Sequence, residues 1–222
     1  DLHFVIPELI DKVNFNKGPY YAEKGDLTTA GYVSFNTKNY LSNDFIKIEG
    51  GQYNTFRAIS GINLLNKNAI GKNQSLYLGT EASYTNGYFE NPQHFSRYNG
   101  LLKYHGSNGK HSTLTALLSA FSSKWNASGQ IPDRAVADGT IGFFGAIDNN
   151  EGGQTSRYNA SVELLQQLSN GATIRNRVYY SRYQFELYSN FTFFKEDPVN
   201  GDQIRQKESR NIFGYHSAWQ QD

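Results

Sequence analysis

The sequence predicts an all-β protein, a transmembrane antiparallel β-barrel with about eight strands in this chain, preceded by a separate short segment. Apolar and polar side chains alternate along many segments, and the connections alternate between tight turns and long loops. Much of the apolar content is aromatic, with 16 Tyr and 15 Phe among 222 residues, as expected for a barrel with aromatic girdles. No stretch is long and apolar enough for a transmembrane helix.

The alternation is clearest in Ser75–Thr85, Ser112–Ser122 and Tyr158–Leu168, where one parity is apolar and the other is mostly polar. A period of two predicts strands with one apolar face. Shorter or less regular matches lie at Phe45–Gly50, Phe56–Leu65, Arg97–Tyr104, Thr173–Leu187 and Asn211–Trp219.

Charged side chains in these segments share the parity opposite the apolar series. They are Lys47, Glu49, Arg57, Glu81, Arg97, Lys103, Arg157 and Glu163. An Arg or Lys facing lipid at the bilayer midplane costs roughly 2–4 kcal/mol, so we expect the charged face to line a wet lumen. The apolar face is then expected to contact lipid through Leu76, Leu78, Leu114, Leu118, Val162 and Leu164.

The connections predict the orientation of the barrel. Ser107–Lys110 and Ser169–Ala172 are tight Asn-Gly turns, whereas Tyr88–Phe95, Lys124–Gln154 and Lys195–Arg210 are long loops. Short periplasmic turns and long extracellular loops are typical of outer-membrane barrels. A soluble β-sandwich also has alternating strands, but the loop asymmetry, the aromatic content and strands of ten or more residues favour the barrel.

Composition and motifs argue against enzyme chemistry. The net charge of +1 gives no pull toward nucleic acid, and the absence of Cys excludes disulfides and thiolate metal sites. The five His residues lack paired metal-ligand spacing, and neither a nucleophile elbow nor a P-loop occurs. Asp148–Glu151 and Asp197–Asp202 are predicted to be turns rather than Ca²⁺ loops. We therefore expect no catalytic residue, no metal site and no cofactor.

The segment before the predicted barrel carries a family resemblance. Val13–Asp26 followed by Ala30–Thr37 resembles the end of the plug domain of TonB-dependent outer-membrane receptors. The shared pattern is an alternating apolar strand, a Lys-Gly-Pro step, an Ala-Gly pair and an Asn–Thr strand leading into the barrel. Lys24 departs from the pattern, since the family often has an aromatic residue there.

The resemblance implies a plug inside a 22-stranded barrel. Residues 1–40 would then be the C-terminal part of the plug and residues 41–222 the first barrel strands of a longer protein. It also implies a transporter in the outer membrane of a Gram-negative bacterium, energised by the TonB complex through an N-terminal box that this chain lacks. The alternatives are a closed eight-stranded structural or adhesive barrel without transport, and a soluble β-sandwich binding module.

The expected partners are outer-membrane lipid, the TonB complex and a scarce nutrient, with no nucleic acid. A ferric siderophore is the leading ligand class, followed by an oligosaccharide or a cobalamin-type cofactor. By resemblance, Glu23, Lys24 and Asp26 occupy a plug loop that points toward the ligand. Aromatic and charged residues in the long loop supply the other candidates, because they can stack on and pair with a ligand: Trp125, Asp133, Arg134, Phe143 and Phe144. Loop packing or an interfacial girdle is the alternative role for these aromatic residues.

Overall fold

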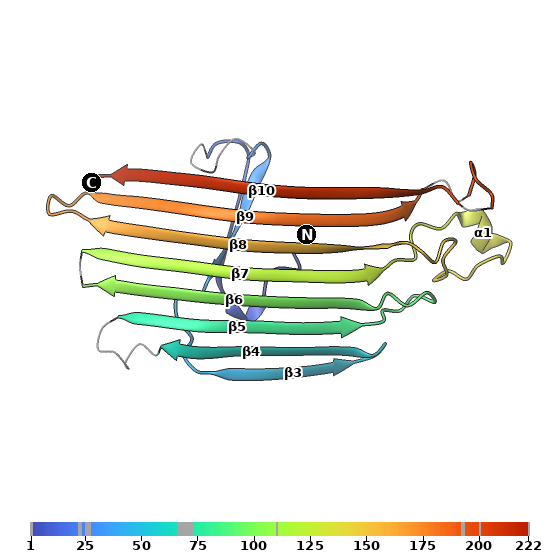
Figure 1. Ribbon diagram of the computed structural model, residues 1–222, viewed down its shortest axis with the longest axis horizontal. Helices are drawn as coiled ribbons and strands as arrows, with labels where there is room; N and C mark the ends of the chain where they lie inside the picture. The colour runs from blue at the N-terminus through green and yellow to red at the C-terminus, as the bar shows by residue number, and fades with distance from the viewer. Residues whose placement is uncertain are drawn as a thin grey trace.

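The computed structural model is built almost entirely from antiparallel strands (Figure 1). It describes residues 2–21, 24, 28–65, 73–109, 111–191, 194–199 and 201–221. In this part of the chain, eight strands form one large sheet and two form a separate hairpin. No helix among the described residues has the length and apolar character needed to cross a membrane.

The large sheet is a simple meander in which each strand pairs with its neighbour in sequence. Its strands are β3 (Phe45–Gly51), β4 (Thr55–Leu65), β5 (Gln74–Thr85), β6 (Phe95–Asn108), β7 (Ser112–Asn126), β8 (Gly152–Gln167), β9 (Thr173–Asn190) and β10 (Gln203–Gln220). The sheet is open, because β3 and β10 do not pair with each other. The closed eight-stranded alternative is therefore wrong.

All eight predicted strands are confirmed, but most are longer than the alternation indicated. The predicted loop Lys195–Arg210 is wrong in its second half, because β10 begins at Gln203 and pairs with Asn190. Residues 203–210 are polar on both faces apart from Ile204, so they show no alternation, and the hydrogen-bonded ladder holds them instead. For the same reason the loop predicted at Lys124–Gln154 spans only residues 127–151.

The pairing register confirms the two predicted faces. Directly paired residues point to the same side of a sheet, and one row across the strands is Lys47, Ile59, Glu81, Asn99, Phe121, Arg157 and Tyr183. We call the side carrying this row the inner face. The opposite, outer face carries the predicted lipid-facing residues, including Leu118, which is 54% exposed.

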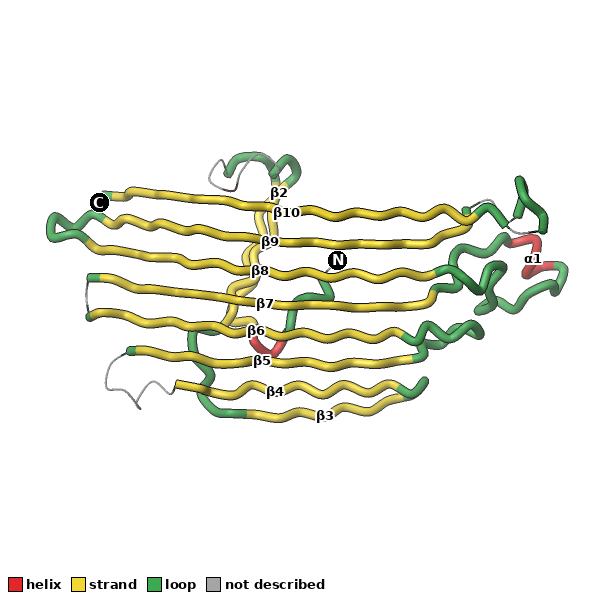
Figure 2. The backbone as a smooth tube through the Cα atoms, viewed as in Figure 1, coloured by secondary structure: helices red, strands yellow, loops and turns green. Residues whose placement is uncertain are grey.

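The N-terminal elements lie against the inner face. The short 3-10 helix η1 (Pro7–Leu9) leads into β1 (Ile10–Lys17), which pairs with β2 (Gly31–Thr37). Figure 2 shows this hairpin passing across the strands of the large sheet rather than along them. Lys103 on β6 ties the end of β2 to the sheet by donating to the Thr37 carbonyl at 2.8 Å.

A small apolar core joins the two parts. It consists of Ile6, Leu9, Leu41, Ile59 and Tyr77. Leu9 is completely buried above Gly79 of β5, where a Cβ atom would overlap the Leu9 side chain. Gly79 therefore permits the close approach of η1 to the sheet.

Candidate ligand-binding site

A cavity of about 620 Å³ lies on the inner face at the end of the sheet where the long loops gather. Its lining comprises His3, Thr85, Gln93, Phe95, Ser123, Trp125 and Phe185. β5, β6, β7 and β9 supply the walls, and His3 of the N-terminal segment supplies part of the floor. An aromatic cavity with a few polar groups is typical of a small-molecule site.

The strand register explains why these side chains converge. Thr85 is paired with Phe95, while Ser123 lies in the same row as Phe185 through Thr155. Trp125 is two residues beyond Ser123, so it points to the same face. The His3 ring lies 5.2 Å from the Phe95 ring. The cavity thus has three aromatic walls and an imidazole in its floor.

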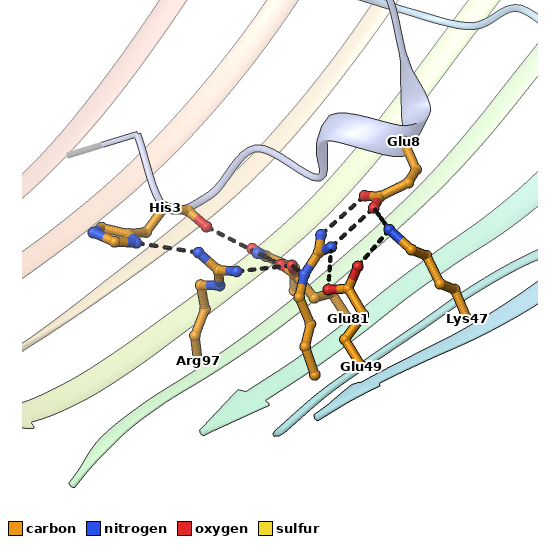
Figure 3. A network of polar contacts seen from close by, with 8 residues as sticks. His3, Glu8, Lys47, Glu49, Glu81 and Arg97 are labelled. Atoms are coloured by element: carbon orange, nitrogen blue, oxygen red, sulfur yellow. Dashed lines mark hydrogen bonds and ion pairs between the residues drawn. The ribbon is translucent and has the colours of Figure 1, made fainter. Parts of the chain in front are cut away.

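Beneath the cavity, a network of charges holds the N-terminal segment to the sheet (Figure 3). The buried Glu81 carboxylate accepts hydrogen bonds from Arg57 at 2.6 Å, Arg97 at 2.8 Å and Asn99 at 2.6 Å. Arg57 also donates to both carboxylate oxygens of Glu8. These charge-assisted bonds neutralise both carboxylates and fix the segment in position.

Two further contacts attach the segment directly below the cavity. Arg97 donates to Nδ1 of His3 at 3.2 Å, and the Asn99 amide donates to the His3 carbonyl at 2.9 Å. At the other side of the network, Lys47 and Glu49 of β3 pair with each other and with Glu8 and Arg57 respectively. The network therefore runs without a break from the cavity floor to the edge strand.

The charge states of the segment follow from these contacts. Hydrogen bonds from Arg57 hold the pKa of Glu8 at about 2, so Glu8 is ionised at neutral pH. Burial, reinforced by the positive charge of Arg97, lowers the pKa of His3 below its usual value. A neutral His3 is what the geometry requires, because Nδ1 accepts the hydrogen bond from Arg97.

Hydrogen-bonding capacity remains at Ser123 in the cavity and in the network beneath it. Arg97 Nε, Asn99 Oδ1 and Ser123 Oγ are buried and make no hydrogen bond within the described part of the chain. Arg97 and Ser123 are directly paired across β6 and β7. Buried polar groups in native proteins normally have partners. Ser123, the one of these three residues that lines the cavity, is therefore suited to a polar group of a ligand.

Arg157 adds a positive charge to the inner face beside this site. Its guanidinium lies 4.5 Å from the centre of the Phe4 ring and 5.0 Å from that of Tyr183. No ion pair engages it among the residues that the structure describes. Arg157 thus combines a free charge with aromatic contacts, as a binding surface for an anionic aromatic ligand requires.

Of the predicted residues that the structure describes, Trp125 alone lines this cavity. Glu23 and Asp26 lie outside the described residues. Lys24 is exposed on the hairpin, with its ammonium 5.0 Å from the centre of the Tyr32 ring.

The other predicted residues lie in the loop between β7 and β8, which contains the short helix α1 (Asp133–Ala137). Asp133 and Phe143 line a separate cavity of about 380 Å³, and Arg134 is exposed on α1. Phe144 packs against Tyr88 and Phe89 of the neighbouring loop. The structure therefore distributes the predicted loop residues over more than one place.

Sequence reasoning missed His3, Ser123 and Phe185 as site residues. The alternation in β7 and β9 predicts that the side chains of Ser123 and Phe185 point inward. It does not predict which strands bring these residues together, or that His3 lies beside them. Phe95 is the last residue of the predicted loop Tyr88–Phe95 and begins β6.

Comparison with known proteins places the fold. No family model and no curated protein matches the sequence. Among solved structures, one match is the ferric-catecholate import receptor Fiu from E. coli K12 in its open form. The alignment covers 95% of this chain and 36% of the Fiu chain, with 14% sequence identity and a TM-score of 0.68. The alignment with the copper transporter OprC covers 99% of this chain and 32% of the OprC chain, with 15% sequence identity and a TM-score of 0.70.

Both proteins are TonB-dependent receptors, so this chain has the fold of part of such a receptor: an antiparallel sheet from an incomplete barrel. The chain spans about a third of the length of each protein it matches, 36% and 32% respectively.

Proposed function

We propose that the chain is part of a TonB-dependent receptor that imports a scarce nutrient across the outer membrane. In this proposal, residues 1–40 are the end of the plug and residues 41–222 are the first barrel strands. The main support is the attachment of the N-terminal segment, through Glu8 and His3, to the charged face of a sheet whose other face is apolar. A filled lumen and a lipid-facing surface require this combination.

The ligand enters from the loop end and binds above His3. Phe95, Trp125 and Phe185 stack on it, Ser123 supplies a hydrogen bond, and Arg97 is reached where it contacts His3. These groups favour an aromatic, oxygen-rich ligand, so a ferric siderophore of the catecholate type is the leading class. Fiu is named as a ferric-catecholate import receptor, which supports this choice; OprC is named as a copper transporter. An oligosaccharide and a cobalamin-type cofactor are the other classes.

The charge network offers a way to couple binding to release of the plug. A ligand oxygen that takes hydrogen bonds from Arg97 competes with His3 and Glu81 for the same guanidinium. Weakening the bond from Arg97 to His3 loosens the N-terminal segment directly below the cavity. Force applied by TonB at the N-terminus would then open a path. No covalent chemistry is involved.

The test uses the full-length receptor and compares binding and uptake of a ferric catecholate, Cu²⁺, cobalamin and an oligosaccharide. We expect saturable binding and TonB-dependent uptake of the ferric catecholate. Epitope tags after Asn108 and after Asp138 test the orientation, and only the second should be labelled on intact cells. Uptake that persists unchanged without TonB, or surface labelling of the first tag alone, contradicts the proposal.

A further inference from the structure

The long loops enclose a second cavity, which is separate from the candidate ligand-binding site. Its volume is about 380 Å³, and it lies between the loop that joins β5 to β6 and the loop that carries α1. Figure 1 shows α1 beyond the ends of β7 and β8. Phe89, Asp133, Val136 and Phe143 contribute side chains to the lining, and Gly129 forms part of the wall. We call this cavity the loop pocket.

Two aromatic rings form walls of the loop pocket, and neighbouring rings hold both of them in place. The Phe89 ring stacks on the Tyr88 ring, with 4.4 Å between the ring centres. The Phe143 ring meets the Phe144 ring edge to face at 5.1 Å, yet Phe143 is 72% exposed. The face of an aromatic ring is electronegative and attracts cations. The pocket therefore offers two fixed rings to a positively charged group.

Asp133 places a carboxylate in the same lining. Its side chain forms neither an ion pair nor a hydrogen bond with the rest of the described chain. Arg134 follows Asp133 on α1 but does not line the pocket, and no cationic side chain does so among the residues that the structure describes. The negative charge of Asp133 is therefore available to a ligand.

Two more carboxylates lie behind the wall of the loop pocket. A Cβ atom on Gly129 would overlap both carboxylate oxygens of Glu151, so this carboxylate lies against the wall. Glu151 and the nearby Asp148 are only 6% and 5% exposed. Asp148 accepts hydrogen bonds from neutral groups, the Asn150 backbone amide at 2.9 Å and the Asn190 side chain at 3.3 Å. Burial raises the pKa of Glu151, and the charge of Asp148 adds to this effect.

The loops around the pocket are acidic, although the whole chain has a net charge of +1. Residues 86–94 and 127–151 contain five Asp and Glu residues, against Arg134 as their one Lys or Arg. The third long loop, residues 191–202, contains three acidic residues and one Lys. A hollow lined by one sign of charge raises the local concentration of ligands of the opposite sign. Both the lining and its surroundings thus favour a cation.

We propose that the loop pocket binds an organic cation, a small molecule with an ammonium group on a compact apolar body. The ammonium group lies between the two phenylalanine rings beside Asp133, and the apolar body contacts Ile131 and Val136. A bare metal ion does not suit the pocket, because such ions need several oxygen or nitrogen ligands. The described residues contain no cluster of three or more such side chains.

The experiment titrates the purified full-length receptor with choline in a maltoside detergent, followed by saturation-transfer NMR at constant ionic strength. We expect saturable binding of choline that is about fivefold or more tighter than binding of its uncharged isostere, in which carbon replaces nitrogen. Asp133→Asn and Phe143→Leu should each weaken choline binding by about fivefold or more. Asp138→Asn is the matched control, because it removes the same charge from an exposed position on the same loop, outside the pocket. It should bind choline with parental affinity.

A lack of saturable choline binding, or equal affinity for choline and its uncharged isostere, would overturn the inference. An equal loss in Asp138→Asn and Asp133→Asn would do the same, since it would show attraction to the acidic loops without a defined site. Binding of a ferric catecholate to the same preparation separates this result from the proposed function. A receptor that binds the ferric catecholate but not choline contradicts the inference alone, and the reverse result contradicts the proposed ligand alone.

Discussion

Arg57 of β4 and Glu8 of η1 form a bidentate ion pair, with Arg57 donating to the two carboxylate oxygens at 2.8 and 2.9 Å. Their side chains are only 16% and 23% exposed. Paired, partly desolvated bonds of this kind are among the stronger polar interactions in proteins. This pair attaches the N-terminal segment to the inner face of the sheet.

Removing the charge of Glu8 should loosen the segment. In Glu8→Gln we expect docking to weaken by about 1–3 kcal/mol, because Arg57 loses a charged acceptor. Distances between spin labels on the segment and on β5, in the full-length receptor, should broaden. Asp11→Asn is the matched control, since Asp11 is exposed and forms no ion pair among the described residues. An identical distance distribution in Glu8→Gln and the parent would show that this pair does not hold the segment.

Acidification should release the segment in two stages. His3 has a lowered pKa when docked, so the released form binds a proton more readily, and docking weakens as pH falls below about 6.5. Glu8 also has a lowered pKa, and its contribution is lost as pH falls from about 4.5 toward about 2. The same label distances should be measured as a function of pH. In His3→Gln, we expect the change that begins below about pH 6.5 to be absent. If the first stage persists in that variant, a group other than His3 causes it.

The contact between Gly79 and Leu9 should be sensitive to volume. A side chain at Gly79 overlaps Leu9, so Gly79→Val should displace η1 at a cost of about 1–3 kcal/mol. Gly100 on β6 is the matched control, because nothing lies within 4 Å of the position its Cβ would take. We expect altered label distances in Gly79→Val and parental distances in Gly100→Val. Parental distances in Gly79→Val together with altered distances in Gly100→Val would show that η1 does not lie over Gly79.

Trp125 and Phe144 should differ in what they affect. Trp125 lines the cavity, so Trp125→Ala should weaken binding of a ferric catecholate by roughly ten- to a hundredfold, or about 1–3 kcal/mol. Phe144 packs against Tyr88 and Phe89, so Phe144→Ala should lower outer-membrane abundance and leave affinity unchanged. Arg134→Ala tests whether the exposed Arg134 on α1 contributes to ligand affinity. Parental affinity in Trp125→Ala would move the binding site away from this cavity.

Much of the fold was predictable because alternation has a direct physical cause. Leu118 and Arg157 could be assigned to opposite faces from parity alone, and the register confirms the assignment. The extended ends of β8 and β10 were not predictable, because their side chains are polar on both faces and hydrogen bonding to β9 decides their structure. Alternation detects only the part of a strand whose two faces meet different surroundings.

The site was less predictable, because it depends on contacts between distant segments. Trp125 lines the candidate cavity and was predicted because an aromatic residue at a loop boundary is a reasonable binding candidate; its role in binding stays a prediction. His3 and Phe185 were not found, since their proximity arises from the docking of the N-terminal segment and from the pairing of strands far apart in sequence. Local sequence patterns do not predict such proximity.

The adjacent residues Leu117 and Leu118 of β7 separate the two environments that we assign to the sheet, with the outer face against lipid and the inner face against the N-terminal segment. Leu117 lines an inner-face cavity together with Phe4 and Val5, whereas Leu118 points outward. Nitroxide labels at each position, in the full-length receptor in bilayers, report collisions with oxygen and with a water-soluble nickel chelate. We expect the label at Leu118 to collide with oxygen and to be inaccessible to the chelate, and the label at Leu117 to be shielded from lipid. A water-accessible label at Leu118, or a lipid-accessible label at Leu117, would contradict this assignment.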